Sequence, residues 1–348
     1  MKTKIIRITD LSLQTDDIAY AAEVIRGGGL VVFPTETVYG LGADATNPSA
    51  ARAVYAAKGR PSDNPLIIHL AHPTDVESYA FSNSTYYLLA EKFMPGPLTI
   101  VLNAKDTIPR ETRGGLDTVA VRCPESLVAR ALIKEASVPI AAPSANLSGS
   151  PSPTNASHVI ADMDGRVDVI IDGGDCDFGL ESTILKIDAE REVTLLRPGK
   201  ITPEDIEDIG IKVNIAAAVE SELMDNEVAL SPGMKYKHYA PKAPLLLLDA
   251  STEKSISYVL DNKTDSIAII SYTEELKLWR QAFPNADVYD FGSKQDQMQQ
   301  AHRLFKVLRD TDDKKYSIIY APLPTSTGVG LALYNRMIRA AAHKIIRL

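Results

Sequence analysis

Residues 30–44 read LVVFPTETVYGLGAD and join a short apolar run to a polar segment that contains two glycines. Leu30 to Phe33 has the continuous hydrophobicity of a strand buried on both faces. Pro34 to Asp44 is expected to follow it as a loop, in which threonine hydroxyls and backbone amides offer hydrogen bonds to a small polar ligand. A glycine-rich turn capped by threonines explains the same residues equally well. A ligand site here therefore requires partners from other loops.

Apolar runs of strand length recur through the first 200 residues and alternate with helical segments such as 48–57 and 125–135. The other runs are 65–70, 98–102, 119–121, 139–142, 167–171, 184–187 and 193–196. This alternation predicts an α/β unit with a twisted mixed sheet. Polar loops come directly after several of the strands, where open α/β sheets bind their ligands.

The rest of the chain predicts a second, smaller domain. A polar stretch over 213–243 is expected to be a linker between residues 1–212 and residues 244–348. Apolar runs then resume at 245–248, 267–270 and 317–320, with helical patterns at 252–260, 273–282, 294–309 and 330–342. We expect a Rossmann-like α/β fold for this part.

Composition limits the class of protein. The formal net charge of −8 over 348 residues argues against a surface made throughout for polyanions. The two cysteines, Cys123 and Cys176, provide neither a disulfide framework nor a metal-site spacing, and both are expected to be buried thiols. No segment has the length and hydrophobicity of a signal peptide or a membrane span, so a cytoplasmic location is expected.

Cationic side chains mark two of the loops. Lys58 and Arg60 lie in KGRPSDNP, between a helix and a strand; they either face solvent or line an anion site. Arg122 ends the apolar run TVAVR. Since an arginine among apolar residues needs a carboxylate, Arg122 is expected to meet one from the protein or from a ligand, with equal weight on each.

Small polar residues fill the remaining strand exits. The segment 142–154, APSANLSGSPSPT, has the composition expected where a backbone approaches a phosphate, although a solvated turn is equally consistent. His69 ends a strand, and its spacing from His72 does not suit zinc, so a neutral hydrogen-bonding role is expected. Five such clusters at strand exits of one domain predict a common pocket.

The motifs PTETVYGLG, KGRPSDNPLIIH, TVAVRCP, PIAAPSANLSGSPSPT, GLESTI and LLRPG, in this order, resemble the YrdC-type domain of threonylcarbamoyl-AMP synthases. SPGMKYKHYAP and GVGLALYNRMIRAA are similar to the linker and the last helix of the longer, two-domain form. The resemblance implies an enzyme that makes threonylcarbamoyl-AMP and pyrophosphate from L-threonine, bicarbonate and ATP. It also implies that a separate tRNA threonylcarbamoyltransferase complex moves the product to adenosine 37 of tRNA, with weak tRNA contact by this chain as an open question.

The resemblance also implies roles for individual residues. A basic tetrad falls on Lys58, Arg60, Ser144 and Asn146, with Lys58 and Arg60 in the catalytic, electrostatic role. The residues implied to bind L-threonine are Thr37, His69, Arg122, Ala142 and Ser182. Those implied to bind ATP are Arg60, Asn64, Thr118, Ser144, Asn146, Ser152, Arg197 and Tyr236, the last of these in the linker, which is expected to close over the site. Mg²⁺ is expected with the triphosphate, without an identified protein ligand.

Two other functions compete with this one. A hydrogenase-maturation carbamoyltransferase carries a similar domain, but its zinc fingers would need more than two cysteines. A non-enzymatic RNA-binding module would need a local basic patch on an acidic chain. The sequence contains no Walker A motif and no Gly-x-Ser-x-Gly elbow, and a carbamate that attacks the α-phosphate of ATP needs neither.

Overall fold

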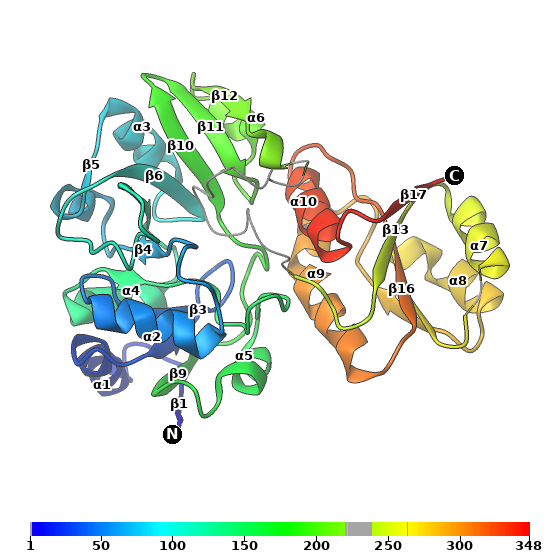
Figure 1. Ribbon diagram of the computed structural model, residues 1–348, viewed down its shortest axis with the longest axis horizontal. Coiled ribbons are helices and arrows are strands. Elements are labelled where there is room, and N and C mark those ends of the chain that lie inside the picture. The colour runs from blue at the N-terminus through cyan, green and yellow to red at the C-terminus, as the bar shows by residue number, and fades with distance from the viewer. Residues whose placement is uncertain (1, 220, 222–238, 263) are drawn as a thin grey trace. The chain divides into compact units, whose positions relative to one another are not determined.

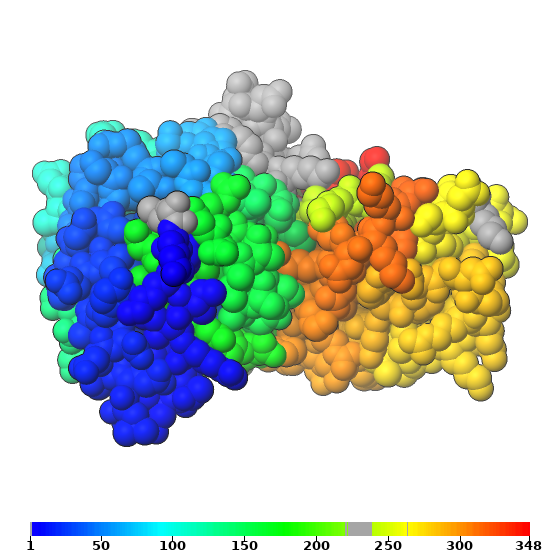
Figure 2. All heavy atoms as spheres, turned by 90° about the horizontal axis from the view of Figure 1, so that it is seen from below, coloured from blue at the N-terminus to red at the C-terminus, as the bar shows by residue number. Residues whose placement is uncertain are grey.

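The computed structural model describes residues 2–219, 221, 239–262 and 264–348 (Figure 1). These residues divide into two compact units. The first unit contains 2–148, 152–177 and the described residues from 181 to 221, and the second contains 149–151, 178–180 and the described residues from 239 to 348. The space-filling view shows the blue segments of the first unit and the yellow and orange segments of the second, which carry α7, α8 and α9 (Figure 2). In the described part of the chain, no helix is long and apolar enough to cross a membrane.

The first unit is built on one mixed sheet of 12 strands, in the order β1-β9-β2-β3-β8-β4-β7-β6-β10-β11-β12, with β5 paired to β6. The strands are β1 (Lys4–Arg7), β2 (Val31–Phe33), β3 (Gly40–Asp44), β4 (Ile67–His69), β5 (Ala80–Phe81), β6 (Leu98–Ala104), β7 (Thr118–Arg122), β8 (Ile140–Ala141), β9 (Val169–Asp172), β10 (Thr183–Ala189), β11 (Glu192–Arg197) and β12 (Lys212–Ile215). β4 runs parallel to β7 and antiparallel to β8, so loops from both directions meet around these three strands.

The helices of this unit are α1 (Thr15–Arg26), α2 (Pro48–Lys58), α3 (Ser84–Phe93), α4 (Leu127–Ala136), α5 (Ala156–Met163) and α6 (Pro203–Glu207), with short 3₁₀ turns at Pro73–Ser78 and Ala217–Val219. α1 and α4 pack together over one end of the sheet, and their apolar faces join Val31, Phe33 and Ile171 in a buried core. The alternation of apolar and polar residues along these helices therefore decides which face covers the sheet.

The structure corrects the predicted loop over Pro34–Asp44. Its second half, Gly40–Asp44, is the strand β3, which pairs antiparallel with both β2 and β8. A Cβ on Gly42 would lie 2.7 Å from the Phe33 ring and 2.9 Å from the Ile140 side chain, so glycine is required for this close packing. Only the first half of the segment remains a loop, as predicted.

The second unit has a five-stranded parallel sheet in the order β15-β14-β16-β13-β17. Its strands are β13 (Leu245–Asp249), β14 (Ile267–Ser271), β15 (Asp287–Asp290), β16 (Ile318–Pro322) and β17 (Ile345–Arg347). Its helices are α7 (Thr252–Asp261), α8 (Leu276–Ala282), α9 (Gln297–Asp310) and α10 (Gly330–Ala340), with 3₁₀ turns at Thr273–Glu275 and Thr311–Asp313. α7 and α8 lie on one face of the sheet, and α9 and α10 lie on the other (Figure 1). The predicted α/β class of both parts and the Rossmann-like form of the second are confirmed.

Candidate functional site

The end of α2 and the loop after β8 meet through the ammonium of Lys58. Gly59 ends α2 in the left-handed conformation, with φ of 62°, and leaves Lys58 on the buried side with 3% of its surface exposed. Lys58 Nζ donates to the backbone oxygens of Ser144 and Asn146, the latter at 2.7 Å. Ser144 Oγ donates to Asn146 Oδ1 at 2.5 Å. Three of the four predicted tetrad residues are therefore in direct contact, and Lys58 does not face solvent.

The loop after β2 completes this junction. Gly40 forms a β-bridge with Ser144, and Ala145 N donates to the Tyr39 oxygen at 2.8 Å. Ala142, predicted to contact threonine, donates its N–H to the Ile67 oxygen at 2.9 Å, which ties the end of β8 to β4. These backbone contacts explain how segments about 100 residues apart in sequence come to lie side by side.

Arg60 and Asn64 lie together before β4. Arg60 Nη2 donates to the Asn64 oxygen at 3.3 Å and to the Pro65 oxygen at 3.4 Å. The Asn64 side chain is 1% exposed, and neither its Nδ2 nor its Oδ1 has a hydrogen-bond partner among the described residues. Thr118 begins β7, and because Ile67 pairs with Ala120 in parallel register, Thr118 lies at the same end of the strands as Asn64.

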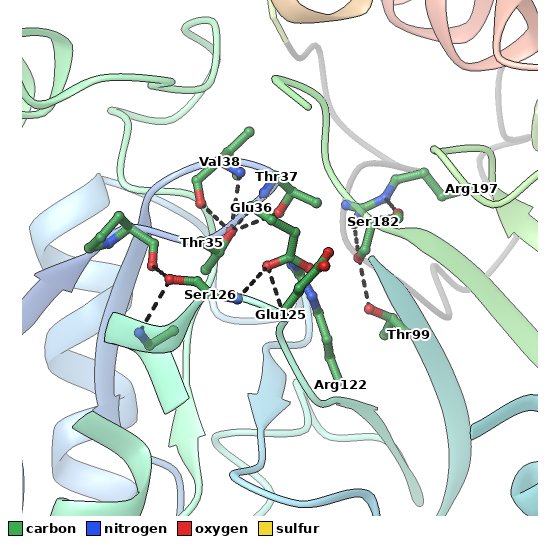
Figure 3. A network of polar contacts seen from close by, with 12 residues as sticks. Thr35, Glu36, Thr37, Val38, Thr99, Arg122, Glu125, Ser126, Ser182 and Arg197 are labelled. Carbon is green, nitrogen blue, oxygen red and sulfur yellow. Dashed lines mark hydrogen bonds and ion pairs between the residues drawn. The ribbon is translucent and has the colours of Figure 1, made fainter. Parts of the chain in front are cut away.

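Arg122 lies at the opposite end of β7 and meets a carboxylate of the protein. Its Nη2 contacts Glu36 Oε1 at 2.6 Å, and both side chains are about 5% exposed. The other oxygen of Glu36 accepts from the N–H groups of Glu125 and Ser126 at 3.2 and 3.4 Å (Figure 3). Arg122 Nε is buried and has no hydrogen-bond partner in the described part of the chain. The guanidinium therefore keeps one donor for a second acceptor.

His69 is the register partner of Arg122 on β4 and packs edge-on against the Phe33 ring. Burial, together with the neighbouring Arg122 charge, lowers the pKa of His69 to about 3. The imidazole is therefore neutral at physiological pH, as predicted. Its Nδ1 is buried and lacks a hydrogen-bond partner within the described residues.

Ser182 is held between two side chains at the start of β10. Its hydroxyl shares a hydrogen bond of 2.7 Å with Thr99 Oγ1 and accepts from Arg197 Nη2 at 3.1 Å (Figure 3). Arg197 Nε also donates to the Ser182 backbone oxygen at 3.0 Å. Thr99 is in turn the register partner of Arg122 on the adjacent strand. Arg197, implied to bind ATP, thus directly contacts a residue implied to bind threonine.

Two further predicted residues are fully buried and already hydrogen-bonded. Thr37 shares a 2.8 Å hydrogen bond with Thr35 and has no exposed surface. Ser152 donates to Glu181 Oε1 at 2.5 Å and also has no exposed surface. Tyr236 and most of the segment predicted to close over the site lie outside the described residues. The start of that segment, 213–215, belongs to β12, which pairs with β11 and is therefore part of the sheet.

Sequence reasoning did not identify Glu36, Thr99 and Glu181, which hold Arg122, Ser182 and Ser152. The motifs did contain Glu36 and Glu181, and the requirement for a carboxylate near Arg122 was the available signal, although it does not say which carboxylate approaches. Among the described residues, no group of three or more His, Cys, Asp or Glu side chains could hold a metal ion.

The cysteines and a nearby cavity stand apart from this chemistry. Both cysteines are buried thiols, as predicted, and burial raises the pKa of Cys123 to about 11 and raises that of Cys176 as well. A cavity of about 610 Å³ lies beside α4 and is lined by His72, Arg130 and Lys134 among others, but by none of the predicted site residues.

Comparison with known proteins covers both units. Residues 23–199 match a family model shared by Sua5, YciO and YrdC and described as "Telomere recombination", and residues 201–342 match "Threonylcarbamoyl-AMP synthase, C-terminal domain". The chain is 42% identical to the threonylcarbamoyl-AMP synthase of Bacillus subtilis over 100% of both chains. It is 41% identical to that of Pyrococcus abyssi, over 95% of this chain and 96% of the relative. The crystal structure of P. abyssi Sua5 complexed with L-threonine superposes with a TM-score of 0.90 at 38% identity over 100% of both chains.

Proposed function

The chain belongs to the threonylcarbamoyl-AMP synthase family, in its two-domain form, and from that premise we propose how its residues carry out the reaction. The protein is a nucleotidyltransferase that joins L-threonine, bicarbonate and ATP into threonylcarbamoyl-AMP and releases pyrophosphate. Its product serves the N6-threonylcarbamoyladenosine modification of tRNA. Full-length similarity to enzymes leaves no support for the alternative of a non-enzymatic RNA-binding module.

One observation carries the assignment of the site: several buried polar atoms without partners belong to residues implied to bind substrate. Arg113 Nε and Ser271 Oγ are of the same kind but lie on residues with no such role. Among the described residues, those on residues implied to bind substrate are both side-chain polar atoms of Asn64, Nδ1 of His69 and Nε of Arg122. Leaving a buried polar group unsatisfied costs about 1 to 3 kcal/mol, and native proteins rarely retain such groups without a function. Bound ATP and threonine would satisfy them.

The strands β4 and β7 separate the two substrates in this proposal. Asn64 and Thr118 lie at the start of these parallel strands, and His69 and Arg122 lie at their ends. At about 3.3 Å per residue, the four steps from Thr118 to Arg122 span roughly 13 Å. This length suits an ATP adenylyl group at one end and a threonine carboxylate at the other.

Arg122 would bind the threonine carboxylate through its Nε while Glu36 keeps the other side of the guanidinium in place. The neutral His69 would accept or donate a hydrogen bond without adding charge. Ser182, held by Thr99 and Arg197, would present its hydroxyl to the amino acid. The contact between Arg197 and Ser182 couples the two substrate groups through one side chain.

The chemistry requires two anions to meet. The threonine amine adds to bicarbonate with loss of water and gives a carbamate, and a carbamate oxygen then attacks the α-phosphorus of ATP. The bond from the α-phosphorus to the bridging oxygen breaks, and pyrophosphate leaves with its electron pair. Lys58 and Arg60 would stabilise the negative charge that builds on the oxygens of the α-phosphate and on the leaving pyrophosphate. Alignment of the reactants can lower the barrier by roughly 7 to 11 kcal/mol.

Lys58 also holds the Ser144–Asn146 backbone in position, because its ammonium contacts two carbonyl oxygens there. Removal of Lys58 would therefore change both the charge and the shape of the site.

Magnesium is not assigned to protein ligands. The described residues contain no cluster of metal-binding side chains, and Glu36 and Glu181 are engaged by Arg122 and Ser152. If Mg²⁺ accompanies ATP, triphosphate oxygens and water would hold it, as is common for this ion. No step of the proposed reaction depends on it.

Binding of each substrate to separate variants tests the two-ended site. Calorimetry should show that Arg122→Ala weakens the binding of L-threonine about 10- to 150-fold, because a charge-assisted hydrogen bond is lost. The affinity for a non-hydrolysable ATP analogue should change little. Asn64→Ala should do the reverse. Arg110→Ala, which removes an exposed arginine paired with Asp117, is the matched control and should change neither. Weakening of the ATP analogue alone by Arg122→Ala would contradict the assignment.

We further propose that the product passes to a tRNA threonylcarbamoyltransferase complex. Mixed anhydrides hydrolyse readily, so transfer to a partner is favoured over release into bulk water. A weak contact with tRNA and a cytoplasmic location stay predictions from the sequence.

A further inference from the structure

The second unit has a cavity of about 190 Å³ at the carboxyl edge of its parallel sheet. The walls come from the ends of β13, β14 and β16 and from the helices that follow them. The chain leaves β13 and β14 toward α7 and α8 on one face, and it leaves β16 toward α10 on the other face (Figure 1). Adjacent strands whose connections go to opposite faces open a crevice, and open α/β sheets bind ligands there.

A buried hydroxyl without a partner marks this cavity. Ser271, the last residue of β14, lines the cavity and is 1% exposed. Its Oγ has no hydrogen-bond partner among the residues that the structure describes. Burial without a hydrogen bond is costly for a hydroxyl, and native proteins rarely leave a buried polar group without a partner. A ligand with a hydrogen-bonding edge would satisfy it.

Aromatic side chains form much of the remaining wall. Tyr272, Trp279 and Tyr320 all line the cavity and are each less than 8% exposed. Flat rings of this kind favour stacked or edge-on contact with another planar ring. At about 30 Å³ for each water molecule in the liquid, the cavity has room for roughly six waters. This volume suits one small ring system.

The charges around the cavity disfavour phosphate. Among the described residues, the one cation on the wall is Lys294, which is already paired with Glu275 at 2.9 Å. Asp249 adds a second carboxylate to the wall. The N-terminus of α7 beside it is capped by Ser251, whose Oγ accepts from Lys254 N at 3.4 Å. A phosphate group would therefore meet two carboxylates and no uncommitted cation.

From these features we infer that the second unit binds a small planar heterocycle without phosphate, of the size and hydrogen-bonding pattern of a nucleobase, with its polar edge at Ser271 and its ring against the aromatic wall. This site is separate from the catalytic residues, and it does not depend on the roles proposed for them.

Trp279 provides a local signal, because it is the chain's one tryptophan and it lines the cavity. The full-length protein is titrated with adenine, cytosine, adenosine and AMP while Trp279 fluorescence is recorded. At least one free base should change the fluorescence saturably at millimolar concentration or below, and AMP should bind at least tenfold more weakly than adenosine. Ser271→Ala should weaken binding of the base roughly tenfold, because one buried hydrogen bond is lost.

Two controls keep the result interpretable. Ser271→Ala removes an unpartnered hydroxyl, so its unfolding midpoint without ligand should equal or exceed that of the unchanged protein. Ser257→Ala removes an exposed hydroxyl on α7 that bonds Glu253 and should leave base binding unchanged. No saturable response to any probe, equal binding to the Ser271→Ala variant, or AMP binding as tightly as adenosine would each overturn the inference. Pyrophosphate release by these variants is measured separately, so failure here leaves the catalytic proposal intact.

Discussion

Substitution of Glu36 by glutamine would leave the buried guanidinium of Arg122 without its counter-charge. The pair is 2.6 Å apart with side chains 5% and 4% exposed, so solvent cannot replace the lost carboxylate. Removal of one member of a buried pair costs about 3 to 5 kcal/mol. At about 2 to 4 °C per kcal/mol for a domain of this size, the unfolding midpoint of the first unit should fall by between about 6 and 20 °C.

Threonine should recover part of this loss, because its carboxylate would bind the same guanidinium. In scanning calorimetry, saturating L-threonine should therefore stabilise Glu36→Gln more than it stabilises the unchanged protein. Glu111→Gln is the matched control: Glu111 also pairs with an arginine at 2.6 Å, but the side chains are 55% and 38% exposed, and at most about 1 kcal/mol should be lost. A Glu36→Gln midpoint within 2 °C of the unchanged protein, or equal stabilisation by threonine, would refute this reasoning.

Three further predictions follow from the same contacts. His69 has a pKa of about 3 in the folded protein, below its value near 6.5 in the unfolded chain, so the unfolded chain binds the proton first as pH falls. The free energy of unfolding should therefore decrease by about 2 kcal/mol between pH 6.5 and pH 5. Chemical denaturation should show that His69→Gln loses this pH dependence, and an unchanged dependence would argue against a buried neutral imidazole. Arg197→Lys should raise the KM for threonine as well as for ATP, because the second hydrogen bond to Ser182 is lost; a change in the KM for ATP alone would contradict the coupling proposed from this contact. Lys58→Ala should lower kcat by at least about 100-fold in the pyrophosphate assay, and a fall below tenfold would exclude the electrostatic role.

The strands that position the site could be predicted because they are short and buried on both faces. β2, β4 and β7 appear in the sequence as continuous apolar runs, and each lies within about two residues of its expected bounds. His69 and Arg122 were expected at strand ends, and both occupy the last position of their strands. Local hydrophobicity was sufficient here because both faces of these strands are covered.

Elements defined by long-range pairing could not be predicted in the same way. β3 contains two glycines, and it is a strand only because it pairs with β2 on one side and β8 on the other. β15 reads DVYD and β17 reads IIR, and both are edge strands. Their sequences are too polar or too short to show the apolar run or the alternation that predicts a strand. α3 was also missed, although Asn83 caps it by accepting from Tyr86 N.

The partners of the site residues were equally out of reach. Glu36 lies 86 residues before Arg122, and Thr99 lies 83 residues before Ser182. A single sequence can show that a buried arginine needs a carboxylate, but the register of β6, β7 and the loop after β2 decides which one approaches.

Pyrophosphate release from ATP with labelled bicarbonate, measured with and without L-threonine, is the most direct test of the synthase reaction proposed for this protein. We predict release that requires both threonine and bicarbonate, with the bicarbonate label recovered in a threonylcarbamoyl-adenylate product. Release that is independent of threonine, or no release at all from the intact full-length protein, would contradict it.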